Sequence, residues 1–357
     1  MTSQHETWDS SHFRAQIESA LQDFVRAQAE WLDRLGPDAK RLVEYARVSV
    51  SGGKRFRASF CWWGHHAVAE PSDPVALVRA CSALELLHAS ALVHDDYMDA
   101  SDVRRGRPAT HRAFEQLHRE QGWATSPELY GASAAILLGD MLLSWSDELL
   151  RTCGLPAERV LDALGYFDLT RSEVVTGQFL DVSAQARGAA DVDTAMTVLR
   201  YKSAKYSIER PLHVGAALAG ADATRIEQLS RFGLPLGEAF QLRDDLLGVF
   251  GDPEETGKPA GDDLVEGKRT VLVALALDAA PPAAARRLDA ALGTPLGEAD
   301  VDELRAIIED SGARAQVEEV IGHLAGRAVE ALRAADVDPQ AEVVLTELAA
   351  AATQRTV

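Results

Sequence analysis

Three aspartates, Asp95, Asp96 and Asp99, stand at the end of a stretch of helically spaced apolar residues, and no other feature constrains the chain as much. The residues before them recur at the three- and four-residue steps of an amphipathic helix: Ala80, Ala83, Leu84, Leu87, Ala91 and Leu92. At about 3.6 residues per turn, Asp95 and Asp99 project from one face, about 6 Å apart along the axis. Like charges at that spacing repel unless a cation lies between them, and carboxylate oxygens suit Mg²⁺. The motif alone leaves a solvated acidic helix end as the alternative.

Basic residues and a second acidic pair accompany this motif. Arg104, Arg105 and Arg107 follow it in a predicted turn, and guanidinium groups bind phosphate oxygens in a bidentate manner. Asp244 and Asp245 lie near the end of a second long apolar stretch. Carboxylates on two helices of one bundle can face each other across a cavity, and such a cavity would hold metal ions on both sides of a phosphate.

Composition and charge exclude several classes of protein. The 357 residues include 36 Lys and Arg and 55 Asp and Glu, and the net charge of −19 argues against general binding to nucleic acid or an anionic bilayer. The three cysteines, Cys61, Cys81 and Cys153, form no CxxC pair, so neither a disulfide framework nor a zinc site is expected. Residues 1–11 are polar, and no uninterrupted apolar run reaches about 18 residues. A cytoplasmic protein without a membrane span is therefore expected.

The residue pattern predicts an all-α fold. Strand-like alternation is scarce, and 46% of the residues are hydrophobic, which is enough for a substantial core. Helices are expected over residues 12–35, 56–69, 74–99, 132–151, 156–186, 191–219 and 222–250. Residues 132–151 are apolar on most sides and are expected to form a core helix in the middle of the bundle. A kink is expected at Pro211, and a glycine-rich loop over residues 251–263. No linker divides the chain, so a single domain is expected over residues 1–357, with residues 1–11 flexible.

Several motifs occur in a fixed order. They are Gly52-Gly53-Lys54-Arg55-Phe56-Arg57, Glu85-Leu86-Leu87-His88, Asp95-Asp96-Tyr97-Met98-Asp99, Arg104-Arg105-Gly106, Gly177-Gln178, Lys202 and Gln241-Leu242-Arg243-Asp244-Asp245. In content and order they resemble the trans-isoprenyl diphosphate synthase family, and among its members the geranylgeranyl diphosphate synthases. The resemblance implies long helices around a deep central cavity, a homodimer, and an Mg²⁺-dependent prenyltransferase. Such an enzyme joins isopentenyl diphosphate to an allylic diphosphate (dimethylallyl, geranyl or farnesyl) by ionisation, condensation and elimination, and releases diphosphate.

By this resemblance, the two aspartate clusters bind two or three Mg²⁺ ions and the allylic diphosphate. The metal ligands are Asp95, Asp96 and Asp99 in the first cluster and Asp244 and Asp245 in the second. Breaking the allylic C–O bond leaves negative charge on the diphosphate, which metal ions and fixed cations stabilise. The resemblance assigns those cations to Arg104, Lys202 and Lys258. For each of these three, a solvated surface cation is the alternative.

A second set of residues is similar to the family's site for the diphosphate of isopentenyl diphosphate. It consists of Lys54, Arg57, His88 and Arg105. His88 lies two helical turns before Asp95 on the same face, so it can reach the same cavity mouth. A buried structural histidine is the alternative. The resemblance also gives Gln178 and Gln241 a role in positioning diphosphate or water, with hydrogen bonding between helices as the alternative.

The chain departs from the family pattern at Gly248, where many members carry a third aspartate in the second motif. Glycine cannot ligate a metal through a side chain, which puts the strength of metal binding on this side in doubt. Asp252 comes one helical turn later, and whether it substitutes is left open.

The residues before Asp95 bear on product length, because the growing prenyl chain is expected to run along this helix. Ser90 and Ala91 are small where C15 enzymes of the family usually have an aromatic ring, and Leu87 lies deeper on the same face. A C20 product, geranylgeranyl diphosphate, is expected, and Ser90→Phe is expected to shorten it. Longer C25 to C35 products are the alternative.

Two other functions remain open for a chain with these motifs. A class I terpene cyclase also ionises diphosphates at aspartate-rich metal sites, but it has no use for a second diphosphate site containing Lys54, Arg57 and His88. A non-catalytic partner subunit of the same fold is expected to lose one aspartate cluster, and this chain retains both.

Overall fold

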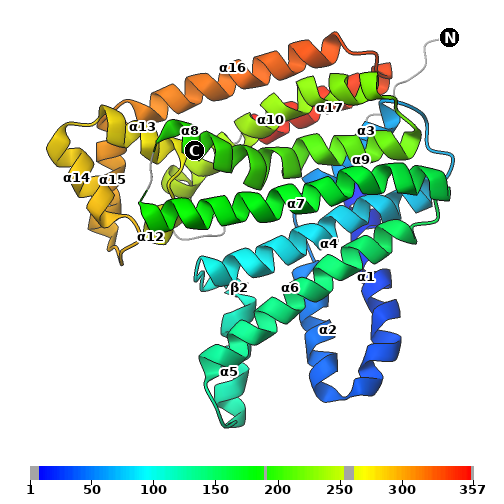
Figure 1. Ribbon diagram of the computed structural model, residues 1–357, viewed down its shortest axis with the longest axis horizontal. Helices are drawn as coiled ribbons and strands as arrows, with labels where there is room; N and C mark the ends of the chain where they lie inside the picture. Colours follow the sequence, from blue (N-terminus) through cyan, green and yellow to red (C-terminus); the bar gives the residue numbers. More distant parts are fainter. Residues whose placement is uncertain (1–7, 189–190, 253–260, 355–357) are drawn as a thin grey trace. The chain divides into compact units, whose positions relative to one another are not determined.

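The computed structural model describes residues 8–188, 191–252 and 261–354, and these residues are almost entirely helical (Figure 1). Within these ranges, the two strands are β1 (Val103–Arg104) and β2 (Arg107–Pro108), which pair antiparallel as a short hairpin. The all-α fold expected from the sequence is therefore confirmed. The hairpin was expected only as a turn.

The chain divides into two compact units. Unit 1 comprises residues 1–166, 211–222 and 338–344, and unit 2 comprises residues 167–210, 223–337 and 345–357. The single domain expected over residues 1–357 stays a prediction.

Unit 1 contains the helices that carry the first aspartate motif. They are α1 (Ser10–Leu32), η1 (Asp33–Leu35), α2 (Pro37–Ser49), α3 (Phe56–His66), α4 (Pro74–Met98), α5 (Thr110–Gln121) and α6 (Pro127–Arg151), with the first part of α7 (Ala157–Arg187) and most of α9 (Arg210–Ala219). α4 begins where the Asp73 side chain accepts from the backbone N–H of Ala76, and Pro74 occupies the first helical position. Its predicted course over residues 74–99 is confirmed.

α4 and α6 pack along each other and form the middle of unit 1 (Figure 1). They approach closely at Gly139 of α6, where an added Cβ would lie 2.1 Å from the His94 Nε2 atom. The Ser90 hydroxyl donates to the Gly139 carbonyl oxygen at 2.7 Å. The aspartate end of α4 is therefore fixed against α6 by small residues and one buried hydrogen bond.

α4 and α6 are also long and apolar enough, by composition, to cross a membrane. The α4 stretch is 72% buried within the protein and the α6 stretch 50% buried, so α4 is a core helix. α6 was expected to be buried on most sides. It instead exposes Leu129, Ile136 and Leu137, which lie at helical spacing along one face.

Unit 2 contains the second aspartate motif. Its elements are the rest of α7, α8 (Val192–Val198), η2 (Leu199–Glu209), α10 (Ala223–Phe250), α12 (Asp262–Glu266), α13 (Val271–Ala279), α14 (Pro282–Ala291), α15 (Glu298–Asp310), α16 (Ala313–Arg333) and the end of α17 (Pro339–Thr353). α10 packs against η2 and α16. The Arg243 guanidinium of α10 binds both oxygens of Glu318 on α16 at 2.6 Å, which fixes the rotation of α10.

The region 191–219 differs from the single kinked helix expected there. It consists of α8, the π-helical η2 and α9, and the irregular stretch lies just before Pro211. Proline has no N–H to donate to the preceding turn, which accounts for the irregularity on that side. α7 and α10 can lie close to η2 because each has a glycine facing it. An added Cβ at Gly177 of α7 would lie 2.3 Å from the Lys202 nitrogen, and one at Gly237 of α10 would lie 2.4 Å from the Ala204 oxygen.

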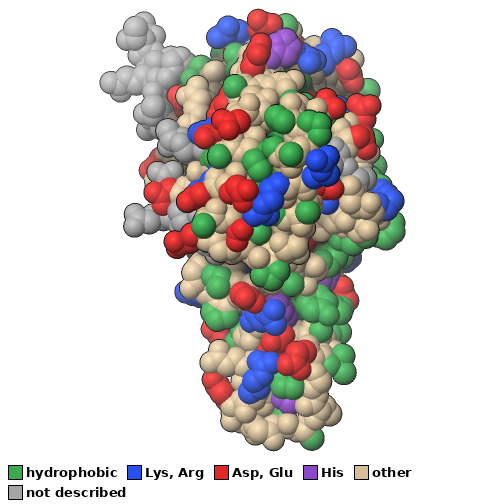
Figure 2. Space-filling view, turned by 90° about the vertical axis from the view of Figure 1, so that its left-hand side faces the viewer, with side chains coloured by type: hydrophobic (Ala, Val, Ile, Leu, Met, Phe, Trp, Pro, Cys, Tyr) green, Lys and Arg blue, Asp and Glu red, His purple; other side chains and the backbone are tan. Residues whose placement is uncertain are grey.

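Charged side chains of both signs are interspersed on the face of the molecule shown in Figure 2. The excess of acidic residues is therefore spread among basic ones on this face and does not form a patch of one sign.

Candidate active site

The last turn of α4 carries the first two aspartates, and Asp99 caps its C-terminus. Asp96 is buried, and the Arg104 Nε donates to its Oδ1 at 2.8 Å. The backbone N–H of Ser101 also donates to the Asp96 carbonyl oxygen at 2.9 Å. The chain thus turns back after α4, and the β1–β2 hairpin places its arginine on the middle carboxylate of the motif.

The same hairpin contacts the basic loop, defined here as residues 51–57. Arg105 donates from Nη1 to the Ser51 carbonyl oxygen at 2.8 Å, and an added Cβ at Gly53 would lie 3.0 Å from its Nη2. Three residues of the loop have positive φ: Gly52 (70°), Gly53 (96°) and Arg55 (56°). Glycine adopts this conformation without strain, whereas for Arg55 it must be held by contacts.

His88 lies among the guanidinium groups that this arrangement gathers. Burial lowers the pKa of His88 well below its usual value, and the positive charges of Arg57, Arg105, Arg104 and Arg55 lower it further. The imidazole is therefore neutral at pH 7 and can offer one donor and one acceptor. The structure thus brings together the predicted residues Arg57, His88, Arg104 and Arg105. Lys54 is exposed on the basic loop.

A buried ion pair joins the basic loop to α4. Arg55 donates from Nη1 to Glu85 Oε2 at 3.1 Å, and the Ala58 backbone N–H at the start of α3 donates to Glu85 Oε1 at 3.2 Å. Arg55 and Glu85 are both buried. Sequence reasoning quoted both residues in motifs but gave them no role. The sequence did contain a signal for this pair. Glu85 is an acidic residue among the apolar residues of a core helix, and a buried charge is expected to have a partner of opposite charge.

The second motif lies on α10. Asp245 is buried and accepts from the Gln241 Nε2 at 2.8 Å, while Asp244 is half-buried. Burial raises the pKa of Asp245 to about 8, with further increases from the negative charges of Asp263 and Asp244 and an opposing effect of the Gln241 hydrogen bond. Gln241 therefore contacts the acidic motif itself.

The space over Gly248 is occupied by the carboxylate of Asp263. An added Cβ at Gly248 would lie 1.9 Å from Asp263 Oδ2 and 2.4 Å from its Cγ. Lys268 Nζ lies 3.2 Å from Asp263 Oδ1 and holds the carboxylate there. Asp252, which the sequence left open as a substitute, is exposed. Asp263 was missed because only the folded chain brings α12 back over α10.

Of the two lysines assigned to the departing diphosphate, the structure describes one. Lys202 of η2 forms an ion pair with Asp181 of α7, with Nζ and Oδ2 2.6 Å apart. Gln178, one turn before Asp181, is half-buried on the same helix. Lys258 lies outside the described residues.

The donor chemistry of both motifs fits Mg²⁺, a hard cation that takes oxygen ligands. The crowding of Asp244, Asp245 and Asp263 is the kind of like-charge contact that a divalent cation relieves. Among the described residues, no three acidic, histidine or cysteine side chains converge closely enough to hold a metal ion by themselves. Mg²⁺ commonly completes its shell with water and substrate phosphate, so such a site does not require a closed protein cage.

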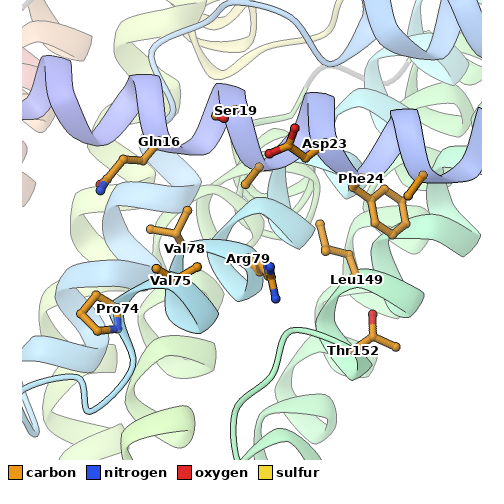
Figure 3. Close-up of a pocket in the computed structure, with 12 residues that line it drawn as sticks. Gln16, Ser19, Asp23, Phe24, Pro74, Val75, Val78, Arg79, Leu149 and Thr152 are labelled. Atoms are coloured by element: carbon orange, nitrogen blue, oxygen red, sulfur yellow. The ribbon is translucent and has the colours of Figure 1, made fainter.

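A separate pocket in unit 1 lies away from the aspartates. Its volume is about 470 Å³, and Figure 3 shows the residues of α1, the start of α4 and the end of α6 that line it. Val78 in its wall precedes Asp95 by 17 residues (95 − 78) on the same helix. That separation is about 25 Å at a rise of about 1.5 Å per residue, so the pocket is not part of the aspartate site.

The residues expected to set product length lie in two environments. Ser90 is buried and bonded to the α6 backbone, and Leu87 is also buried. Ala91 is half-buried. A large ring at position 90 would have to displace α6, so Ala91 is the better position at which to test chain length.

Comparison with known proteins identifies relatives of the whole arrangement. A sequence profile of the family described as polyprenyl synthetase matches residues 39–310. A solved structure of geranylgeranyl pyrophosphate synthase from Corynebacterium glutamicum, complexed with isoprenyl diphosphate and magnesium, is 39% identical with a TM-score of 0.95, covering 98% of this chain and 100% of that one.

Two curated proteins extend the range of products among the relatives. Geranylfarnesyl diphosphate synthase from Natronomonas pharaonis is 31% identical over 75% of this chain and 78% of its own length. (2E,6E)-farnesyl diphosphate synthase from Mycobacterium tuberculosis is 34% identical over 78% of this chain and 74% of its own length. The relatives thus share one fold and differ in the chain length that their names record.

The contact over Gly248 predicts that Gly248→Ala destabilises the protein, although alanine is favoured over glycine within a helix by about 1 kcal/mol. The new methyl group would meet the Asp263 carboxylate, and overpacking of this kind costs about 1–3 kcal/mol. The free energy of unfolding, measured by urea denaturation in the presence of a chelator, is expected to fall.

The matched control is Gly165→Ala on α7, because no atom lies within 4 Å of an added Cβ there. This variant is expected to be as stable as the unmodified protein or more so. The double variant Gly248→Ala with Asp263→Gly is expected to lose less free energy of unfolding than the sum of the losses in the two single variants. Full additivity would contradict the contact.

Proposed function

The chain belongs to the polyprenyl synthetase family, and we propose that it condenses isopentenyl diphosphate with an allylic diphosphate to give all-trans geranylgeranyl diphosphate. Membership establishes a prenyltransferase of isoprenoid biosynthesis. The named relatives make C15, C20 and C25 products, so the C20 product is the part that we propose. Its support is the likeness to the Corynebacterium enzyme over nearly the full chain and the small Ala91 on α4.

One observation carries this proposal: unit 1 gathers Arg57, Arg104 and Arg105 around a neutral His88, two turns before Asp95. Guanidinium groups suit diphosphate oxygens, and the neutral imidazole adds hydrogen bonding without further repulsion. A cluster of cations beside an acidic motif suits an enzyme with two diphosphate substrates. It disfavours a class I terpene cyclase, which ionises a single diphosphate.

The proposed roles come from the resemblance to the family, and the surroundings of His88 and Arg104 support them. Lys54, Arg57, His88 and Arg105 hold the diphosphate of isopentenyl diphosphate, which directs its double bond toward the allylic carbon. Arg104, Lys202 and Lys258 neutralise charge on the departing diphosphate, and Gln241 orients the carboxylate of Asp245. Arg104 already bonds Asp96, so it is in position to bridge the acidic motif and a phosphate.

We assign the metal ligands to Asp95, Asp96 and Asp99 and to Asp244 and Asp245, with two or three Mg²⁺ ions. When bound, Mg²⁺ supplies positive charge that stabilises the leaving diphosphate. The carboxylates orient the phosphates through their fixed positions at the ends of α4 and α10. We further propose a cytoplasmic location.

The proposal is tested by incubating the purified protein with Mg²⁺, isopentenyl diphosphate and, separately, dimethylallyl, geranyl and farnesyl diphosphate. The expected product from each primer is C20, identified by chromatography after removal of the diphosphate. A C25 or longer main product would correct the chain length only. No elongation of any primer would contradict the proposed reaction.

Ala91→Phe is expected to shorten the main product, because the ring would fill volume along the face of α4 that leads away from the aspartates. The product distribution from dimethylallyl diphosphate is expected to shift from C20 toward C15. Ala91→Ser, which hardly changes the volume, is the control and is expected to keep the C20 product. An unchanged distribution in Ala91→Phe would show that the chain does not pass this position.

We also propose that the protein is a homodimer that uses the exposed apolar face of α6, which includes Leu129, Ile136 and Leu137. Leu137→Glu would place a charge on this face and is expected to convert a dimer into a monomer, measured by light scattering after size-exclusion chromatography. Leu35→Glu, at an exposed leucine of η1, is the control and is expected to leave the mass unchanged. A monomeric unmodified protein would contradict the proposal.

A further inference from the structure

We propose that α1 positions the basic loop for binding isopentenyl diphosphate, through Glu18 and Gln22. α1 ends at Leu32, before the first residue of the polyprenyl synthetase match at position 39, so the family comparison assigns it no part in the reaction. The inference rests on the proposed function of the loop. It makes Glu18 a positioning residue, which acts through Arg55 and Gly52.

Two side chains one turn apart on α1 hold the first half of the loop. Glu18 Oε2 accepts from the Gly52 backbone N–H at 3.1 Å and from Arg55 Nη2 at 2.5 Å. The Gln22 Nε2 donates to Glu18 Oε1 and to the Ser51 hydroxyl oxygen, both at 3.1 Å. α1 therefore binds the loop through one backbone group and two side chains.

The loop depends on such external contacts. Its three positive φ values include that of Arg55, the N-cap residue of α3, whose own side chain does not cap that helix. The guanidinium of Arg55 is bound by two carboxylates, Glu85 from α4 and Glu18 from α1. Since a non-glycine residue adopts positive φ only when its surroundings hold it there, the two acids determine the direction in which Lys54 and Arg57 leave the backbone.

Two roles of Glu18, as a nearby negative charge and as a positioning residue, predict opposite effects of its removal on the binding of a diphosphate. A negative charge beside a cationic site weakens the binding of an anion, so neutralisation alone would tighten the binding of a diphosphate. Loss of the bonds to Gly52 and Arg55 would release the loop and weaken that binding. The sign of the change therefore separates a positioning residue from a nearby charge.

The decisive variant is Glu18→Ala, which removes both acceptor oxygens, with binding of isopentenyl diphosphate measured by titration calorimetry without Mg²⁺ or allylic substrate. We expect the Kd and the KM for isopentenyl diphosphate to rise about tenfold, the size of one lost charge-assisted hydrogen bond. The kcat and the KM for the allylic substrate are expected to stay within about twofold. A general loss of structure would not produce this separation.

Glu30→Ala on the same helix is the matched control, since Glu30 is exposed and the chemical change is identical. It is expected to leave every constant unchanged. Glu18→Asp keeps the charge and is expected to recover part of the affinity. Gln22→Ala, which removes no charge, is expected to raise the KM for isopentenyl diphosphate by a smaller factor.

Unchanged or tighter binding in Glu18→Ala would overturn the inference, as would an equal rise in both KM values. A protein that binds isopentenyl diphosphate but elongates no primer would contradict the proposed reaction alone, because the calorimetric comparison still holds. Failure of the unmodified protein to bind isopentenyl diphosphate would overturn both.

Discussion

The buried pair between Arg55 and Glu85 is the interaction on which the proposed substrate site in unit 1 depends. The carboxylate of Glu85, ten residues before Asp95 on α4, binds the guanidinium of the basic loop and the backbone N–H of Ala58 in the first turn of α3. Replacing a buried ion pair by apolar residues is often neutral for stability, whereas removing one partner costs about 3–5 kcal/mol. The pair therefore contributes less to stability than to geometry. It fixes the distance between the basic loop and the aspartates of α4, the helix that also carries Glu85.

Both candidate sites hold side chains of like charge close together. In unit 1, burial and the neighbouring guanidinium groups keep His88 neutral, and Arg104 bonds Asp96 within the aspartate motif. In unit 2, Asp244, Asp245 and Asp263 crowd together, and burial raises the pKa of Asp245, with a further increase from its two acidic neighbours. Such crowding is unfavourable in the protein alone and becomes favourable when ions of opposite charge bind. The substrate anions and their cations are suited to supply that compensation.

The sequence predicted the features that depend on local pattern. Apolar spacing located α4 and α10, and the position of Asp95 and Asp96 on the last turn of α4 followed from the same count. It did not predict contacts between residues far apart in sequence. The role of Glu18 requires α1 to lie beside a loop more than thirty positions later, and Asp263 reaches Gly248 from another element. Neither contact has a local signal.

Two predictions from the sequence, for α6 and for the stretch before Pro211, were wrong for reasons that the spacing of residues along the chain does not show. α6 is apolar on most sides, which indicated burial, but one of its faces is exposed in unit 1. Apolar spacing cannot distinguish a side chain that packs within the chain from one that is available to another molecule. The stretch before Pro211 read as one helix because a π-helical turn and an α-helical turn require the same residue types.

The number of residues in the π-helical stretch η2 determines where Lys202 lies relative to Asp181. The hydrogen bonds of a π-helix join residues five positions apart, so removing one residue from η2 would rotate the side chains on one side of the deletion relative to the other. The helix would survive, but Tyr201 or Ser203 would then stand where Lys202 now meets Asp181, and the glycines at 177 and 237 would face the wrong atoms. Substitutions in η2 at positions other than Lys202 keep this register. An insertion or deletion changes the register, and with it the side chain that faces Asp181.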